Sequence, residues 1–162
     1  MIIKAVDAIP KELKLKEPFT IANETVEFGE NVFLKIETDE DIIGWGCATP
    51  DSVTEETIKT VLSCFNEQMK NLLIGLNPLH IHYINDLIEE KIIGNPSLRA
   101  GINMALYDIL GKKANLPLYK LLGGYKDKIE TSITIGLNPV DTMVEKAKYY
   151  VSEGFSCLKV KC

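Results

Sequence analysis

Hydrophobic and polar residues alternate with a period of two along the first third of the chain. This alternation predicts strands over residues 1–15, 31–38 and 41–50. The last two runs are separated by a short acidic turn, so we expect them to form an antiparallel hairpin. Residues 16–30 are polar, contain Pro18 and Gly29, and follow no clear period, which predicts a loop.

From Ser52 onward the apolar residues recur every three or four positions, which is typical of one face of a helix. The residues on this face are Ile58, Val61, Leu62, Phe65, Met69, Leu72 and Leu73. Ser52 and Glu55 are spaced as a capping box and Gly75 is a natural stop, so we expect one helix between Ser52 and Gly75. Two more helices are expected over residues 78–94 and 96–113. Strands followed by helices predict an α+β domain.

The last part of the chain returns to strand-like patterns around one helix. Residues 129–136 and 155–162 are rich in β-formers, and residues 138–154 between them are helical, with Asn138 as the expected cap and Pro139 in the first turn. This order predicts a β-α-β unit with parallel strands. Because parallel strands need cover on both faces of their sheet, we expect the chain from about residue 126 onward to begin a larger domain.

Composition and charge exclude several classes of protein. The 162 residues are 46% hydrophobic and carry a net charge of -5, with no basic block that could neutralise phosphates. Nucleic acid is therefore not expected as a partner. No apolar stretch approaches the roughly 20 residues that span a bilayer, and the N-terminus has no signal-peptide pattern. We expect no membrane partner and a cytoplasmic protein.

Cysteine and histidine spacing gives no metal site. The four cysteines are Cys47, Cys64, Cys157 and Cys162. None of them forms a CxxC pair, so neither a zinc site nor a disulfide framework is indicated. His80 and His82 lie two positions apart on a predicted helix and so face different directions, which is wrong for a shared metal and indicates a structural role.

Lys159 and Lys161 lie one residue apart in the final apolar run. Side chains at positions i and i+2 of a strand share a face, so both ammonium groups would lie side by side. The pair is either a solvated strand face or a site that uses the charge. A free lysine has a pKa of about 10.4 and is protonated at neutral pH, so a lysine base requires burial or a neighbouring cation. Lys159 would supply that cation to Lys161.

Four motifs resemble one known family. They are "EPFTIANETV", "DIIGWGCATP", "RAGINMALYDILGKKANLPLYKLLGG", and "TSITIG" followed at the distance of one barrel helix by "LKVKC". The chain resembles the muconate-lactonizing branch of the enolase superfamily, the mandelate racemase and muconate lactonizing enzyme group, and within it the dipeptide epimerases. The resemblance implies a capping domain over residues 1–125 and, over residues 126–162, the first β-α-β of an incomplete (β/α)7β barrel of the TIM type.

The resemblance also implies the chemistry. In the family an α-proton is removed next to a carboxylate while Mg²⁺ stabilises the enolate, and here Lys161 matches the general base. Lys159 matches a second lysine that can also contact the substrate, and Thr134 matches a substrate-contacting threonine, although a β-branched residue there is equally expected from strand propensity. The metal ligands and the second base belong to later strands, so we expect no metal ligand in this chain and no activity from these 162 residues alone.

Three positions bear on specificity and on the cap. Glu24 stands where epimerases of acidic dipeptides carry an arginine, which favours a neutral or cationic substrate if Glu24 is not simply a solvated residue. Cys47 stands where the family pattern has a glutamate. Asp108 has a buried-looking setting on a helix of the cap and is not expected to bind metal.

The expected function is that of an isomerase acting on a small molecule, a dipeptide, in a complete enzyme that forms a homo-oligomer. Two rivals share the same features. Muconate cycloisomerase and o-succinylbenzoate synthase have the same cap and the same lysine pair, and a non-catalytic module could keep the cap for oligomerisation.

Overall fold

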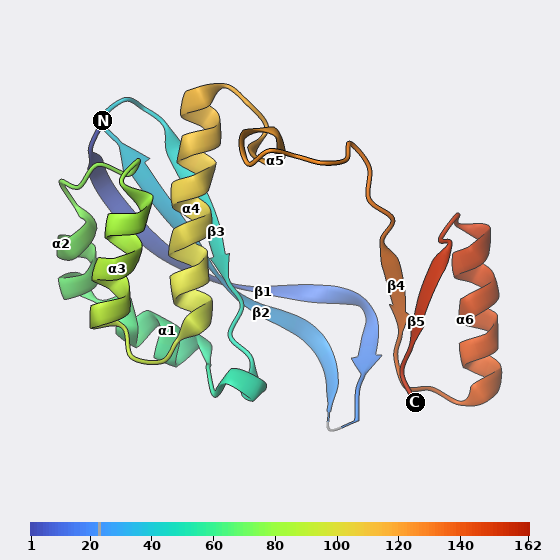
Figure 1. The fold of residues 1–162 in the computed structure, drawn as a ribbon. Coiled ribbons are helices and arrows are strands. Elements are labelled where there is room, and N and C mark those ends of the chain that lie inside the picture. Colours follow the sequence, from blue (N-terminus) through green and yellow to red (C-terminus); the bar gives the residue numbers. More distant parts are fainter. Residues whose placement is uncertain (23) are drawn as a thin grey trace. The chain divides into compact units, whose positions relative to one another are not determined.

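A three-stranded sheet begins the chain, with its strands in the order β1-β2-β3. The strands are β1 (Ile3–Thr20), β2 (Thr25–Thr38) and β3 (Ile43–Ala48). The hairpin predicted from the alternation is confirmed, because β2 and β3 pair antiparallel with Val32 opposite Ala48 and Glu37 opposite Ile43. The computed structural model describes residues 1–22 and 24–162 (Figure 1).

The loop expected over residues 16–30 is wrong. β1 continues to Thr20 and β2 starts again at Thr25, so most of this polar segment is a two-stranded ribbon. Most of its side chains are exposed or only half-buried, so no face of the ribbon needs to be apolar. Backbone pairing alone defines such strands, and the alternation that marks a half-buried strand is absent.

The chain divides into two compact units. The first unit comprises residues 1–13 and 30–124, and the second unit comprises residues 14–29 and 125–162. The two long strands β1 and β2 therefore contribute to both units.

The region from Ser52 to Gly75 contains separate short helices, so the single helix expected there is wrong. It holds the 3-10 turn η1 (Ser52–Thr54), α1 (Ile58–Cys64) and α2 (Glu67–Leu73). Thr57 caps α1 through a capping box with Thr60, and the Asn66 side chain accepts hydrogen bonds from the first turn of α2. The capping box expected from Ser52 and Glu55 is also wrong, since Asp51 caps η1 and Glu55 ends it in the left-handed conformation.

The apolar face predicted for this region is buried although α1 and α2 are separate helices. Val61, Phe65, Met69 and Leu73 are all buried in one core. Asn66 lies between them and competes for backbone hydrogen bonds, which ends one helix and caps the next. The period in the sequence therefore identifies the buried side chains correctly but not the continuity of the backbone.

The remaining helices of the first unit are α3 (Ile81–Lys91), α4 (Pro96–Ala114) and the short α5 (Leu118–Leu121). Both predicted helices are present, although α3 starts later than expected because Asn77 forms a turn with its side chain accepting from Leu79 N. Figure 1 shows α4 lying across β3, with α1, α2 and α3 beside it. The buried core lies between these helices and the sheet.

Glycines let α4 approach β3 closely. A Cβ at Gly46 would overlap the Gly101 carbonyl oxygen, and a Cβ at Gly101 would lie 2.8 Å from Leu34 Cδ1. Any larger side chain at either position would force the helix away from the sheet.

The second unit contains the predicted β-α-β arrangement. Its elements are β4 (Ser132–Ile135), α6 (Val140–Ser152) and β5 (Cys157–Val160). β4 and β5 pair parallel, with Ser132 opposite Cys157 and Ile135 opposite Val160. The cap expected from Asn138 is wrong, because Pro139 occupies the N-cap position and the Asn138 amide donates to Gly136 O at 3.1 Å.

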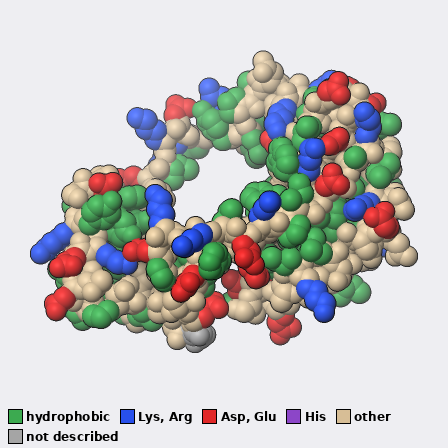
Figure 2. Space-filling view, turned by 180° about the vertical axis from the view of Figure 1, so that it is seen from behind, with side chains coloured by type: hydrophobic (Ala, Val, Ile, Leu, Met, Phe, Trp, Pro, Cys, Tyr) green, Lys and Arg blue, Asp and Glu red, His purple; other side chains and the backbone are tan. Residues whose placement is uncertain are grey.

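Charged side chains of both signs are interspersed over the face drawn in Figure 2. This face has no extended basic area of the kind that binds a phosphate backbone. Among residues 1–22 and 24–162, no helix combines the length and the apolar character needed to cross a membrane.

Candidate active site

The two lysines and the threonine singled out from the sequence come together at the ends of β4 and β5. Thr134 and Lys159 are direct partners in the parallel ladder. Partners in register present their side chains on the same face of a sheet, and Lys161 shares that face because it lies two residues after Lys159. The Lys161 amide donates to Ile135 O at 3.0 Å, which extends the pairing to the end of the strand.

The surroundings of the three side chains differ. Lys161 and Thr134 are half-buried, whereas Lys159 is exposed. Within the described residues, neither lysine forms an ion pair with a carboxylate. Among residues 1–22 and 24–162, therefore, no carboxylate pairs with the two lysines on this face, which favours the binding of an anion there.

Glu24 lies at the end of the hairpin formed by β1 and β2. Its carbonyl oxygen accepts a hydrogen bond of 2.9 Å from Ile21 N, and its side chain is exposed. The hydroxyls of Thr20 and Thr25 are 3.0 Å apart across the hairpin. Asn23, which belongs to the "FTIANETV" motif, lies outside the described residues.

The hairpin end contacts the residues that follow β4. Thr20 O accepts a hydrogen bond of 2.9 Å from Leu137 N. A Cβ at Gly136 would lie 2.9 Å from Thr20 O and 3.3 Å from Phe19 Cδ2, so glycine is needed for this approach. The second unit thus contains Glu24, Thr134, Lys159 and Lys161, and the hairpin carrying Glu24 meets the chain two residues after Thr134.

One set of contacts in this unit was not predicted from the sequence. Lys146 of α6 forms an ion pair of 2.9 Å with Glu17 of β1, and the Tyr150 hydroxyl lies 3.4 Å from the same carboxylate oxygen. Burial raises the pKa of the Tyr150 hydroxyl above its ordinary value, and the negative charge of Glu17 adds to this rise while Lys146 opposes it. The sequence predicted a loop around Glu17. Without a strand there, nothing indicated that the Glu17 side chain would face α6.

Among the described residues, no group of three or more His, Cys, Asp or Glu side chains is arranged to hold a metal ion. His80 occupies the N-cap position of α3 and His82 lies exposed in its first turn, both in the first unit. The described residues therefore do not fit the Mg²⁺ that the resemblance implies. No step of the chemistry is assigned to a metal held by them.

Asp108 forms hydrogen bonds that connect two elements of the first unit. Its carboxylate accepts hydrogen bonds of 2.8 Å from Trp45 N and 2.6 Å from Lys112 Nζ, and so joins α4 to β3. The side chain is 34% exposed, so the expectation that it is buried is wrong. Both donors contact the same oxygen, Oδ2, in keeping with a role in the cap.

Cys47 also lies in the first unit. Its thiol lies 3.5 Å from Asn31 Oδ1, an oxygen that also accepts a hydrogen bond of 3.1 Å from the Thr49 hydroxyl. The residue is half-buried in β3 and takes part in a polar contact between β2 and β3. In this chain a thiol therefore makes the side-chain contact at the position where the family pattern has a carboxylate.

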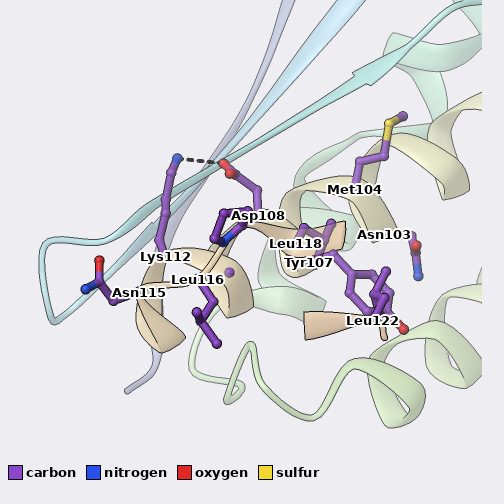
Figure 3. A pocket seen from close by; sticks show the side chains of 11 residues that line it. Asn103, Met104, Tyr107, Asp108, Lys112, Asn115, Leu116, Leu118 and Leu122 are labelled. Carbon is purple, nitrogen blue, oxygen red and sulfur yellow. Dashed lines mark hydrogen bonds and ion pairs between the residues drawn. The ribbon is translucent and has the colours of Figure 1, made fainter. Parts of the chain in front are cut away.

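A cavity of about 800 Å³ lies beside α4 in the first unit. Its walls are mostly apolar and include Met104, Tyr107, Leu116 and Leu122. Figure 3 shows that Asp108 and Lys112 at its edge are paired with each other. None of the predicted site residues lines this cavity, and its charged groups are already engaged.

A sheet covered by α4, followed by a β-α-β unit that presents two lysines and a threonine at its strand ends, defines an enolase-type capping domain with a small parallel sheet after it. Residues 3–123 match the family model described as mandelate racemase / muconate lactonizing enzyme, N-terminal domain. The chain belongs to this family, and the resemblance seen in the sequence is confirmed.

Within this family, the chain is similar to several dipeptide epimerases. The chain is 40% identical to a hydrophobic dipeptide epimerase of Enterococcus faecalis over 99% of this chain and 46% of the relative. It is 36% identical to an L-Lys-D/L-Arg epimerase of Desulforapulum autotrophicum, again over 99% of this chain and 46% of the relative. The crystal structure of the Enterococcus faecalis dipeptide epimerase complexed with Mg and L-Leu-L-Tyr superimposes with a TM-score of 0.95 at 39% identity, covering 100% of this chain and 46% of that one. The chain thus spans about half the length of these relatives.

Proposed function

We propose that this chain is the N-terminal part of an enolase-superfamily epimerase that removes and returns the α-proton of a dipeptide. The observation that carries the proposal is the register of β4 and β5, which sets Thr134 opposite Lys159 with Lys161 next on the same face. The epimerase names of the relatives support the same reaction class.

Each of the three residues has a role that fits its surroundings. Lys161 is half-buried at the end of β5, on the face that also carries Lys159 and Thr134, so it can act as the base toward a ligand held on that face. Lys159 is exposed and can pair with the carboxylate of a bound dipeptide. The Thr134 hydroxyl beside it can donate to the same anionic group.

The domain organisation belongs to the same proposal. Residues 1–125 form the capping domain, and residues 126–162 form the first part of a barrel whose later strands lie outside this chain. In such an enzyme Mg²⁺ and the second base would be held by those later strands. The Mg in the structure of the relative supports a metal in the complete enzyme.

Glu24 narrows the substrate class. A carboxylate at the hairpin end repels an acidic side chain and attracts a cationic one. The hydrophobic and Lys/Arg specificities named for the two relatives fit a site that rejects acidic dipeptides. The proposed substrate is a dipeptide whose epimerised residue is neutral or cationic.

The test is deuterium incorporation at the α-carbon of dipeptides in D₂O by the full-length protein that contains this chain, with Mg²⁺ added. A panel of hydrophobic, cationic and acidic dipeptides should show exchange for the first two classes and the slowest exchange for the third. Muconate and the precursor of o-succinylbenzoate are included in the same assay. Turnover of either acid with no exchange of any dipeptide would overturn the epimerase proposal in favour of the corresponding rival.

A further inference from the structure

The hairpin end is attached to the second unit at two places. One is the backbone hydrogen bond from Leu137 N to Thr20 O, at 2.9 Å. The other is Glu17, three residues earlier in β1, which pairs with Lys146 at 2.9 Å and lies within 3.4 Å of the Tyr150 hydroxyl. The first attachment fixes the backbone, and the second fixes a side chain on the same strand.

The second attachment is more than an isolated surface ion pair. The Lys146 side chain is only 23% exposed, although that of Glu17 is 52% exposed. Tyr150 also contacts Phe155, with ring centroids 6.0 Å apart and the rings at 83°. An exposed pair alone contributes little, but a half-buried cation and a fixed phenol around one carboxylate restrict where β1 can lie.

The position of β1 matters because of what the hairpin carries. Its end includes Thr20, Ile21, Glu24 and Thr25, and the hydrogen bond from Ile21 N to Glu24 O closes it. The same end touches Gly136 and Leu137, directly after the strand that bears Thr134. A displacement of β1 at Glu17 would therefore move Glu24 relative to Thr134 and Lys159.

We propose that Glu17, Lys146 and Tyr150 are positioning residues that hold the hairpin end, and with it Glu24, at the strand ends where the substrate side chain is recognised. This inference rests on the proposed function for its consequence in catalysis. The attachment itself does not depend on that function and is measured separately.

The attachment is tested by hydrogen-deuterium exchange with mass spectrometry on the full-length protein that contains this chain. Lys146→Met and Glu17→Gln should each speed exchange of peptides covering residues 17–25 and Leu137, by about two- to five-fold as expected for loss of a partly exposed pair. The double variant Glu17→Lys with Lys146→Glu should restore exchange toward the parental rate. Lys148→Met removes an exposed lysine from the same helix and should change nothing in these peptides.

Parental exchange in Lys146→Met, or no recovery in the charge-swapped variant relative to the single variants, would overturn the attachment. A global rise in exchange across both units would also overturn it, because it would reveal loss of fold and not release of the hairpin.

The catalytic consequence is tested by measuring KM and kcat separately for each variant. A loosened hairpin end should raise KM for a dipeptide by about two- to five-fold and weaken discrimination between cationic and acidic dipeptides, while kcat changes less than about two-fold. A merely structural defect would lower kcat at unchanged KM and would refute a positioning role. If the parent protein exchanges no dipeptide, the proposed function fails while the exchange experiment still decides the attachment.

Discussion

Two ammonium groups side by side on one strand face repel each other, and the structure explains why the arrangement of Lys159 and Lys161 is useful. The register places the Thr134 hydroxyl opposite Lys159, so the face offers two cations and a neutral donor together. Such a face suits a carboxylate ligand, because among the described residues no carboxylate forms an ion pair with either lysine. In the proposed enzyme this face would contact the carboxylate of the dipeptide.

Glu24 is the residue whose change should alter specificity most simply. Glu24→Arg in the full-length protein should raise kcat/KM for dipeptides ending in glutamate relative to those ending in lysine, by about tenfold or more, because reversing the charge turns repulsion into attraction. The measurement is the ratio of the two kcat/KM values.

Glu27→Arg is the matched control, since Glu27 is an exposed glutamate on the same hairpin and carries the same charge change. An unchanged ratio in Glu24→Arg, or an equal change in both variants, would remove Glu24 from the substrate pocket.

Sequence reasoning at the residue scale succeeded where spacing along one strand defines a face and missed contacts between distant segments. The side-by-side placement of Lys159 and Lys161 follows from strand periodicity alone. The contact of Glu17 with Lys146 and Tyr150 depends on the path of a polar ribbon, and no local pattern encodes that path.

At the scale of the elements, α4 is stabilised by a carboxylate from outside the helix. Glu56 is only 5% exposed, and its Oε1 accepts hydrogen bonds of 3.0 Å from Ser97 N and 2.6 Å from Ser97 Oγ. Its other oxygen accepts 2.6 Å from the Thr54 hydroxyl. A negative charge at a helix N-terminus is favourable, and here it satisfies one backbone donor, Ser97 N, that the Asn95 side chain does not.

Removing this carboxylate should destabilise the first unit. Glu56→Ala should lower the free energy of unfolding by about 1–3 kcal/mol because the half-buried Ser97 donors lose a charged acceptor. Glu56→Gln keeps one acceptor oxygen but loses the charge and the second acceptor, so about 1 kcal/mol is expected. Urea unfolding measures both changes, with Glu55→Gln as the control on an exposed neighbour. Equal stability of Glu56→Ala and Glu55→Gln would contradict this role.

The close packing of α4 on β3 gives a second prediction at this scale. Gly46→Ala should destabilise the first unit by about 1–3 kcal/mol or more, because the new methyl group overlaps the Gly101 carbonyl and the helix must move outward. Thermal unfolding followed by circular dichroism measures the change. Cys47→Ala, on the next position of the same strand, serves as the comparison, and a Gly46→Ala protein as stable as Cys47→Ala would show that α4 adjusts freely.

Elements were predicted well where their side chains face a core and poorly where they do not. α4 and the β-α-β unit follow from apolar periodicity and flanking proline or glycine, and the structure contains them. The ribbon at residues 16–30 has few buried side chains, so its polarity suggested a loop. The split between α1 and α2 arises from capping by Asn66, a local competition that an apolar period does not register.

At the scale of the whole molecule, the chain joins a unit with a hydrophobic core to a unit with a parallel pair of strands. The first unit buries side chains from all three strands of its sheet and from its helices. The second unit has two strands in its sheet, and the charged site lies at their ends. The fold class could be predicted because each unit has a distinct order of elements. Metal ligands could not be predicted from this sequence, since the described residues contain no cluster suited to a metal ion.

The central claim is that Lys161 is a base in an epimerase, and it is tested most directly by α-proton exchange with each epimer of a dipeptide substrate in D₂O. In the full-length protein that contains this chain, Lys161→Ala should slow exchange of one epimer by at least about 100-fold, which is typical for loss of a general base. The other epimer should still exchange, because the base on the opposite face is intact. Lys148→Ala, which removes a lysine from α6, should leave both rates at the parental value. Exchange of both epimers at the parental rate in Lys161→Ala would contradict the account and leave the two lysines as a solvated strand face.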